Sequence, residues 1–469
     1  MDLWWLYWLY WIVVIALMVR VLLRNSDSVR TLAWVMVFVF IPFLGLFLYF
    51  FFGRDTRRKK MVGRRMLAQI KQRAALEVKG GGKACLQPEY LPLATFLENT
   101  SSASLLSADE VEVIADTSIF AERLFSIVES AENHIHIQFY IFEEDDFGKR
   151  LRDLLVKKAS QGVEVRLIYD SVGCWSVDKE FFEGMRCAGI YVESFLKVRF
   201  PILSNRVNYR NHRKLVVVDG VVAMVGGCNI ADRYVKGVGG GTWRDTMLLF
   251  RGGAVNGAQA AFLVDWCFAS RTMLGGKSYF PLQQQGNGPL VQVATSNPVG
   301  SVRPVAGALV KVLSVARRYV YLQTPYFMPD GAFLVALRNA ALSGVDVRLM
   351  IPECSDSAIA DYATKSYLGD LLEAGVKVYL YCGGMLHSKT LVCDDMLSSV
   401  GSTNLDFRSF FYNFEVNAFV YDKGVALKMK ECFLKDVGQC RQLTVGEYNA
   451  RPFLKRCIES LVRLLSPLL

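Results

Sequence analysis

The chain has 469 residues, of which 52% are hydrophobic and 21% charged, and its 54 Lys and Arg against 44 Asp and Glu give a formal net charge of +10. This composition excludes a disordered or collagen-like chain, and the length predicts two or three globular units. Eleven cysteines, an odd number without C-x-x-C spacing, exclude a disulfide framework and a cysteine-based zinc site and indicate a reducing compartment. The mean hydropathy of +0.25 is high for a soluble protein and indicates membrane-embedded segments.

Residues 1–53 predict a transmembrane hairpin with helical spans at about 3–23 and 31–53. Residues 3–19 carry no charge, the apolar run continues beyond Arg20, and residues 31–53 are uncharged. At about 1.5 Å per residue, each span can cross a hydrocarbon core of about 30 Å. A cleaved signal peptide is the alternative for the first span, but a basic leading segment and a small-x-small cleavage site are both missing. We therefore expect both spans to be retained.

Positive charge around the hairpin predicts its orientation. The short connection has three arginines, at 20, 24 and 30, whereas seven Lys and Arg lie within 54–65. The more basic side of a membrane protein usually faces the cytoplasm. This asymmetry therefore places the N-terminus and everything from residue 54 onward in the cytoplasm. The basic run also suits an anionic lipid surface, although a role in topology alone explains it equally well.

Residues 54–106 predict a basic, loosely packed connector. This stretch has a helix-prone piece at 61–78, three consecutive glycines at 80–82 and a Ser/Thr-rich turn near 100–102. From residue 107 onward, the hydrophobic pattern changes to a regular alternation of strands and helices. The connector therefore separates the hairpin from a folded α/β body.

The α/β body repeats itself. Segments beginning at residues 131, 162 and 212 align with segments that begin 185, 182 and 175 positions later. Offsets that drift slowly along one order of features indicate a duplicated domain. Each half predicts a strand (135–141 and 320–326), a helix (147–160 and 332–342) and a second strand (163–170 and 345–352). This order predicts two α/β lobes, at 107–285 and 286–469, with mixed sheets flanked by helices and a pseudo-twofold relationship.

Each half also carries a histidine motif on a predicted strand. The first motif consists of His212, Lys214, Asp219 and Asn229. The second repeats it at the same spacing with His387, Lys389, Asp394 and Asn404. A single His-x-Lys pair would be an ordinary exposed pair, but two complete copies favour an active site. The two aspartates are weaker candidates individually, because a turn explains each of them.

The residues after the first motif predict its local geometry. Asp219-Gly220 lies between two apolar runs and predicts a two-residue hairpin turn. That register sets Gly227 opposite His212 and places both on one face with Lys214 and Asn229. A glycine beside the imidazole would leave room for a substrate phosphate, whose oxygens the Lys and Asn side chains could bind. Neither motif has an acidic cluster that resembles a divalent-metal site, so we expect no metal and no cofactor.

Two H-x-K-x4-D motifs, each followed by Gly-Gly or Gly-Ser and an Asn, resemble the phospholipase D superfamily. Further segments resemble, more specifically, its bacterial cardiolipin synthase family. These segments are the two N-terminal spans, GTWRDT at 241–246, TPYFMP at 324–329, NLDFRS at 404–409, NFE at 413–415 and LSPLL at 465–469. The resemblance covers essentially the whole chain.

This resemblance implies a phosphatidyltransferase with phosphatidylglycerol as substrate. It would move the phosphatidyl group of one phosphatidylglycerol to another, giving cardiolipin and glycerol through a phosphohistidine intermediate. The family pattern makes His212 the nucleophile and His387 the general acid and base, although the symmetry leaves their order open. The implied location is the bacterial inner membrane, as an integral multi-pass protein with cytoplasmic catalytic lobes and anionic lipid as its partner.

The resemblance also implies roles for the groups around the histidines. Lys214, Lys389, Asn229 and Asn404 would hold the phosphoryl oxygens and replace a metal ion. Glu415, 28 residues after His387, stands where the family has a carboxylate that orients an imidazole. Gly240 occupies the equivalent place after His212, so Asp245 is the expected substitute.

Three alternatives stay open at this stage. The chain could be a phospholipase D-type phosphodiesterase, another phosphatidyltransferase or an inactive membrane scaffold. Two membrane spans argue against a nucleic-acid substrate, and two complete motifs argue against a scaffold. The oligomeric state is left open. Residues 453–465 predict a C-terminal amphipathic helix, for which a docked position is favoured over an interfacial one.

Overall fold

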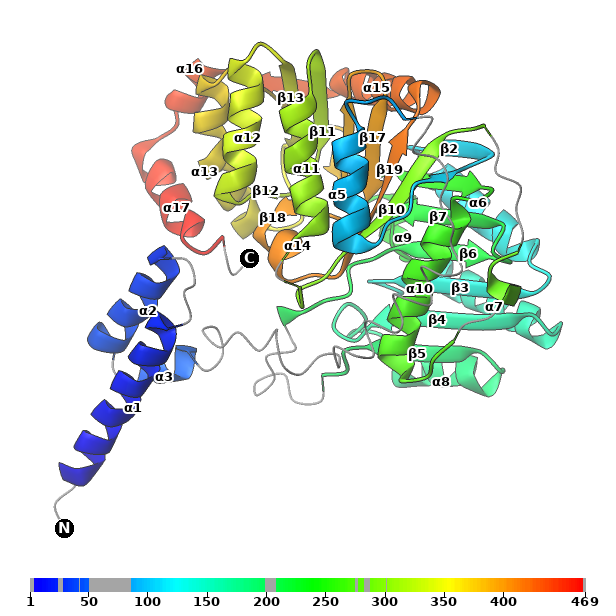
Figure 1. Cartoon of the computed structure of the whole chain (residues 1–469), viewed down its shortest axis with the longest axis horizontal. Helices are drawn as coiled ribbons and strands as arrows, with labels where there is room; N and C mark the ends of the chain where they lie inside the picture. The colour runs from blue at the N-terminus through cyan, green and yellow to red at the C-terminus, as the bar shows by residue number, and fades with distance from the viewer. Residues whose placement is uncertain are drawn as a thin grey trace. The chain divides into compact units, whose positions relative to one another are not determined.

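The computed structural model describes residues 4–23, 28–41, 43–49, 86–198, 208–274, 277–281, 287–300 and 302–466. The chain divides into two compact units. One unit contains the N-terminal helices, and the other contains both α/β lobes (Figure 1). The predicted basic run, the helix-prone piece at 61–78, the three glycines at 80–82 and the last three residues of the chain lie outside the described residues.

The N-terminal unit consists of α1 (Trp4–Leu22), α2 (Ser28–Phe40) and the short α3 (Leu44–Leu48). The second predicted span, 31–53, is not one continuous helix. The sequence places Pro42 just beyond the end of α2, and proline both lacks an N–H group and disfavours helical geometry in the residue before it. In the described ranges, we find no helix that has both the length and the apolar character needed to cross a membrane.

The first lobe is a seven-stranded mixed sheet with the order β2-β9-β7-β6-β3-β4-β5. Its strands are β2 (Glu110–Ile114), β3 (His134–Phe139), β4 (Glu164–Asp170), β5 (Tyr191–Phe195), β6 (Leu215–Val218), β7 (Val222–Gly226) and β9 (Met247–Arg251). One face packs against α6 (Thr117–Glu129), α7 (Asp146–Ser160) and α8 (Lys179–Cys187). The other face packs against α10 (Val255–Ser270).

The second lobe is a nine-stranded sheet with the order β1-β10-β19-β17-β16-β11-β13-β14-β20. Its strands are β1 (Leu106–Ser107), β10 (Leu290–Ser296), β11 (Tyr319–Gln323), β13 (Asp346–Pro352), β14 (Lys377–Tyr381), β16 (Thr390–Cys393), β17 (Leu397–Gly401), β19 (Glu415–Tyr421) and β20 (Cys440–Leu443). Its layers are α5 (Leu91–Ser101), α11 (Pro304–Val315), α12 (Gly331–Leu342) and α13 (Ala358–Glu373) on one face and α15 (Lys423–Val437) on the other (Figure 1).

The two sheets repeat one topology. The run β10-β19-β17-β16-β11-β13-β14 of the second lobe follows the same order as β2-β9-β7-β6-β3-β4-β5 of the first. In both lobes the central strand, β3 or β11, pairs in parallel with β4 or β13 and antiparallel with the strand that follows the motif histidine, β6 or β16. The prediction of a duplicated α/β fold with mixed sheets is confirmed. The predicted strand 320–326 is shorter than expected, because β11 ends before Pro325, which cannot donate a ladder hydrogen bond.

The predicted connector includes a segment that the structure places in the second lobe. The α5 side chains Leu93, Ala94 and Leu97 are fully buried in the core of that lobe. The Ser/Thr-rich turn is in fact the end of this helix, where the hydroxyls of Thr100 and Ser101 donate to carbonyls one turn earlier. Residues 86–106 therefore belong to the folded body, because their apolar side chains have a core to fill.

Candidate active site

The hairpin of the first motif turns with one residue more than predicted. Val218 pairs with Val222, although Asp219 and Gly220 both adopt the left-handed conformation expected of a tight turn, with φ of 53° and 67°. In the second lobe, β16 and β17 make the same turn. The extra residue shifts the register by one, so Gly227 does not lie opposite His212 as predicted.

The turn aspartates lie at the far end of the motif strands from the histidines. The carboxylate of Asp219 accepts backbone N–H groups of residues 132, 133 and 134 at 2.7 to 2.8 Å. Asp394 accepts the equivalent N–H groups of residues 317, 318 and 319 at 2.7 to 2.9 Å. Each aspartate therefore ties its turn to the start of a neighbouring strand, and neither contacts an imidazole.

The backbone of each histidine is held by the opposite lobe. The N–H group of His212 donates to the carbonyl of Phe414 at 2.9 Å, and that of His387 donates to the carbonyl of Arg244 at 2.7 Å. Next to the second contact, β8 (Thr242–Arg244) pairs in parallel with β15 (Gly384–Leu386). The two motifs consequently approach one another at the boundary between the lobes.

Each imidazole is also oriented by a carboxylate from the opposite lobe. His212 Nδ1 lies 3.1 Å from both carboxylate oxygens of Glu415, and His387 Nδ1 lies 2.6 Å from Asp245 Oδ2. Both carboxylates are completely or almost completely buried. The sequence predicts Glu415 as the partner of His387 from its spacing, and Asp245 as the substitute that serves His212. The structure exchanges these two partners between the halves. Because each carboxylate contacts Nδ1, the other ring nitrogen, Nε2, remains available for chemistry.

Gly227 makes room for a carboxylate and not for a substrate phosphate. A Cβ atom at this position would lie 2.0 Å from Asp245 Oδ1. Ser402, the equivalent residue of the second motif, instead donates its hydroxyl to Glu415. The predicted phosphate space beside Gly227 is therefore filled by the carboxylate that binds His387.

The motif lysines lie beneath the histidines. Lys214 Nζ donates to the carbonyl of His212 at 2.6 Å, and Lys389 donates to the carbonyl of His387. Lys389 Nζ also lies 2.8 Å from His387 Nδ1, so this nitrogen has the lysine as well as Asp245 beside it. Both side chains are almost fully buried, and neither lines the cavity described below. Neither lysine therefore belongs to the cavity wall, and burial holds the pKa of Lys214 well below its ordinary value.

Burial controls the protonation of the site. It lowers the pKa of His212 and lowers the pKa of His387 to about 4, although the facing carboxylates act in the opposite direction. Burial also lowers the pKa of Lys389 to about 8. Burial alone would raise the pKa values of Asp245 and Glu415, but the facing histidines and lysines outweigh it and hold both below their ordinary values. These lowered pKa values favour the neutral form of both imidazoles near pH 7.

A cavity of about 290 Å³ brings the two histidines together. Besides His212 and His387, its wall includes both motif asparagines, Asn229 and Asn404. Asn229 is fixed by its amide hydrogen bond of 2.5 Å to the Tyr234 hydroxyl. Within the described part of the chain, the side-chain carbonyl of Asn404 has no hydrogen-bond partner, so a bound molecule or water must satisfy it.

Several cavity residues were missed by sequence reasoning. They are Tyr140, Arg210, Arg233, Tyr326, Asp356, Arg408 and Asn413. Tyr326, Arg408 and Asn413 lie in segments that already carried the family resemblance, which could have marked them. The Tyr326 hydroxyl donates to Asp356 at 2.5 Å, and this places one acidic group among the arginines of the wall. Nothing local in the sequence marks Asp356.

One buried arginine, Arg213, and one partly buried arginine, Arg244, hold the backbone of the orienting carboxylates. Arg213 binds Asp265 at 2.5 Å and donates to the backbone carbonyl of Glu415 at 3.0 Å. Arg244 makes the matching contacts: it forms an ion pair with Asp436 at 2.8 Å and donates to the backbone carbonyl of Asp245 at 2.6 Å. Each arginine therefore fixes the position from which a carboxylate reaches its imidazole.

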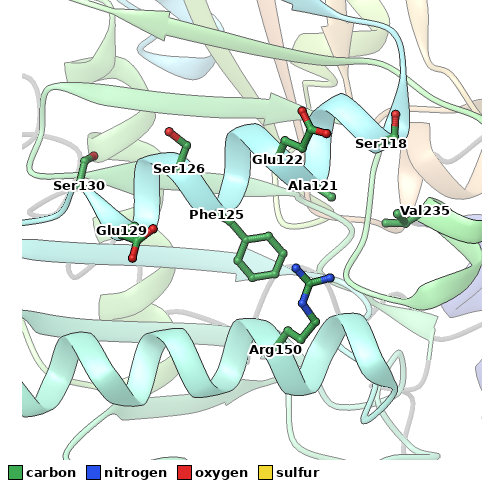
Figure 2. A pocket seen from close by; sticks show the side chains of 9 residues that line it. All are labelled: Ser118, Ala121, Glu122, Phe125, Ser126, Glu129, Ser130, Arg150 and Val235. Atoms are coloured by element: carbon green, nitrogen blue, oxygen red, sulfur yellow. The ribbon is translucent and has the colours of Figure 1, made fainter.

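A second, more open groove of about 780 Å³ runs along α6 (Figure 2). Its lining includes Glu122, Glu129 and Arg150, whose guanidinium lies 4.8 Å over the Phe125 ring. No motif residue and no histidine lines this groove. The smaller cavity between the lobes is therefore the candidate active site.

Comparison with known families matches both lobes and the N-terminal unit. The family described as "Cardiolipin synthase, PLD-like domain" matches residues 124–239 and 309–437, and "Phospholipase_D-nuclease N-terminal" matches residues 8–54. The chain is 40% identical over 460 residues to the major cardiolipin synthase ClsA of Bacillus subtilis (strain 168), with 95% of each chain covered. It is 38% identical over 457 residues to a cardiolipin synthase of Geobacillus thermodenitrificans (strain NG80-2), with 95% of this chain and 90% of that one covered.

Two solved structures share the fold at low sequence identity. A phosphatidylserine synthase from Haemophilus influenzae Rd KW20 matches with a TM-score of 0.62 and 12% identity, covering 80% of this chain and 98% of that one. A polyphosphate kinase from Porphyromonas gingivalis matches with a TM-score of 0.50 and 12% identity, covering 77% of this chain and 54% of that one. These matches agree with the two-lobed architecture described above.

Proposed function

Because this chain belongs to the cardiolipin synthase family of phospholipase D-like phosphatidyltransferases, we propose that it joins two phosphatidylglycerol molecules into cardiolipin and releases glycerol. The observation that carries this proposal is the pair of imidazoles in one cavity, each held at Nδ1 by a carboxylate of the opposite lobe. Such a pair supplies a nucleophile and a proton donor for one phosphodiester. Arginine side chains in the same wall suit an anionic substrate.

In the first half of the reaction, His212 Nε2 attacks the phosphorus and forms an N–P bond. The P–O bond to glycerol breaks, and the glycerol oxygen takes a proton from the imidazolium of His387. The bound phosphodiester is an anion, so it raises the pKa of His387 and favours the protonated form that this step needs. Asp245, at 2.6 Å from Nδ1, stabilises the same imidazolium.

In the second half, the hydroxyl of another phosphatidylglycerol attacks the phosphohistidine. His387 takes the hydroxyl proton as the new P–O bond forms, and the N–P bond to His212 breaks. The cavity amides Asn229 and Asn404 would donate to the phosphoryl oxygens, and the buried lysines would supply positive potential from beneath. Water can also accept the phosphatidyl group from the phosphohistidine, which would give phosphatidic acid. The second candidate function is therefore that of a phospholipase D-type phosphodiesterase.

We expect transfer without a metal ion. Incubation with phosphatidylglycerol in excess EDTA should give cardiolipin and free glycerol in equal amounts, because amides and arginines line the cavity and two buried lysines lie next to its histidines. A bilayer-bound cavity would also favour the lipid alcohol over water. The products can be separated by thin-layer chromatography with labelled glycerol headgroups.

Two outcomes would contradict this expectation. Phosphatidic acid as the main product would make the protein a hydrolase, and complete loss of turnover in EDTA that returns on adding Mg²⁺ would reveal a metal requirement. Heat-inactivated protein is the control for release of glycerol without enzyme.

The N-terminal unit is proposed to anchor the protein in the bacterial inner membrane. The apolar helices α1 and α2, together with the match to an N-terminal family of this superfamily, support a hairpin with cytoplasmic catalytic lobes. The greater basic charge after the hairpin supports the same orientation.

This topology predicts that a Ser26→Cys variant is alkylated by a membrane-impermeant maleimide on intact cells. Residue 26 lies in the predicted external connection, outside the described residues. The native exposed cysteines Cys187, Cys354 and Cys382 are internal controls, since all three should react only after lysis. Labelling of Ser26→Cys only after lysis would contradict the proposed orientation and place residue 26 on the cytoplasmic side.

A further inference from the structure

The C-terminal helix α17 (Phe453–Arg463) is docked on the second lobe by one edge. Its Arg463 guanidinium lies 4.3 Å over the Tyr367 ring of α13 and donates to the Ser366 carbonyl at 3.1 Å. Glu459, which is 2% exposed, forms an ion pair with Arg451. The edge that packs on the lobe is thus partly ionic, which is the reverse of an ordinary docked amphipathic helix.

The apolar face of α17 is exposed instead of buried. Phe453, Leu454, Leu461 and Leu464 are 65% to 79% exposed, and the same face continues through Ile458 and Leu465. Singly exposed apolar residues are normal, but a contiguous row of large ones on one helix face indicates an interaction surface. The expectation of a docked core helix is therefore correct for the contact with α13 and wrong for the apolar stripe.

The charges of α17 indicate what covers this face. The only acidic residue of the helix is Glu459, which is turned into the contact with Arg451. The remaining charged side chains are basic: Arg463 is held against α13, and Lys455 and Arg456 are the other two. An apolar face bordered by basic side chains is typical of a helix lying in the interface of an anionic bilayer.

We propose that α17 is a membrane-surface helix whose apolar face enters an anionic lipid bilayer. The proposal rests on the proposed function for its ligand, because that function makes an anionic phospholipid the substrate. It also connects the lipid contact to the active site. The N-terminal part of α13 supplies Ala360 to the cavity wall, and the next turns of the same helix hold Arg463. Burial of α17 in the interface would therefore seat the cavity wall at the bilayer.

A photocrosslinking experiment on the full-length protein tests the contact. Leu461 is replaced by p-benzoylphenylalanine, and the protein is reconstituted in phosphatidylglycerol vesicles and illuminated. Leu342 of α12 is the matched control site, because it is 66% exposed against 65% for Leu461. We expect lipid adducts at least about fivefold more abundant at position 461, since an interfacial helix places its apolar face among acyl chains. Equal lipid labelling at both positions, or crosslinks from position 461 to the N-terminal unit or to a second copy, would overturn the proposal.

A kinetic experiment tests whether the lipid contact of α17 brings the cavity to the bilayer and so supports turnover there. The double variant Leu454→Glu/Leu461→Glu should lose about tenfold in rate on phosphatidylglycerol vesicles but keep its rate in detergent micelles. Leu342→Glu should keep both rates. An unchanged vesicle rate in the double variant would overturn the proposal. If the unmodified protein makes no cardiolipin in micelles, the proposed function fails, whereas the crosslinking result still decides whether α17 contacts lipid.

Discussion

Replacing either His212 or His387 with alanine should abolish phosphatidyl transfer, with losses of about 10⁴-fold or more. The first variant lacks the atom that forms the bond to phosphorus, and the second lacks the group that moves the proton. Both imidazoles line the same cavity, but each is held in place by its own carboxylate. The remaining imidazole of either variant therefore cannot take over the missing role. Turnover of labelled phosphatidylglycerol by purified protein in detergent measures the loss.

His134 and His136 are the matched controls, because the described part of the chain places them on β3 and away from the cavity. Gln259 of α10 bridges them, at 3.2 Å from His134 Nε2 and 2.9 Å from His136 Nδ1. The His136 ring also stacks on Phe262 at 4.4 Å. Alanine at either position should therefore lower the free energy of unfolding by about 2 kcal/mol and leave most of the turnover of the folded protein. Loss of activity at His134 together with an active His387→Ala variant would defeat the two-histidine mechanism.

Asp245→Asn and Glu415→Gln should each lower kcat by about 10² to 10⁴-fold while changing KM little. The carboxylates accept the Nδ1–H group of the imidazoles and thereby fix the tautomer in which Nε2 is free to react. An amide can donate to Nδ1 instead, which would place the hydrogen on Nε2. Neither carboxylate lines the cavity, so substrate binding should be preserved.

The pH dependence separates this role from a general loss of structure. Asp245 raises the pKa of His387, so its removal lowers that pKa further below the value of about 4 set mainly by burial. A smaller fraction of His387 is then protonated at any pH, and the activity of Asp245→Asn should recover partly as the pH is lowered. Asp219→Asn is the control, because that carboxylate only ties a turn to β3. It should lower thermal stability but leave kcat unchanged, and a fall of kcat equal to that of Asp245→Asn would contradict the separation of roles.

Much of the fold and the two motif histidines can be predicted from the local pattern of residues in the sequence. The duplication is visible because the second lobe repeats the pattern of apolar residues of the first. Each core strand or helix needs such a pattern to bury one face, wherever it lies in the chain. The motif residues His212 and His387 are identifiable because the same spacing occurs twice. The register of the hairpins was missed by one residue, because Asp219-Gly220 fits a tight turn equally well with or without the additional residue.

The sequence by itself determined the α/β class, the duplication, both histidine motifs, Glu415 at the family spacing and Asp245 as its substitute in the first half. Only the tertiary structure decided that Glu415 serves His212 and Asp245 serves His387, that Gly227 admits a carboxylate, and that α17 exposes its apolar face. The physical reason is that periodicity fixes which face of an element a side chain occupies, but not which distant element meets that face. The docking of the lobes determines those contacts, and it joins residues about 140 to 200 positions apart.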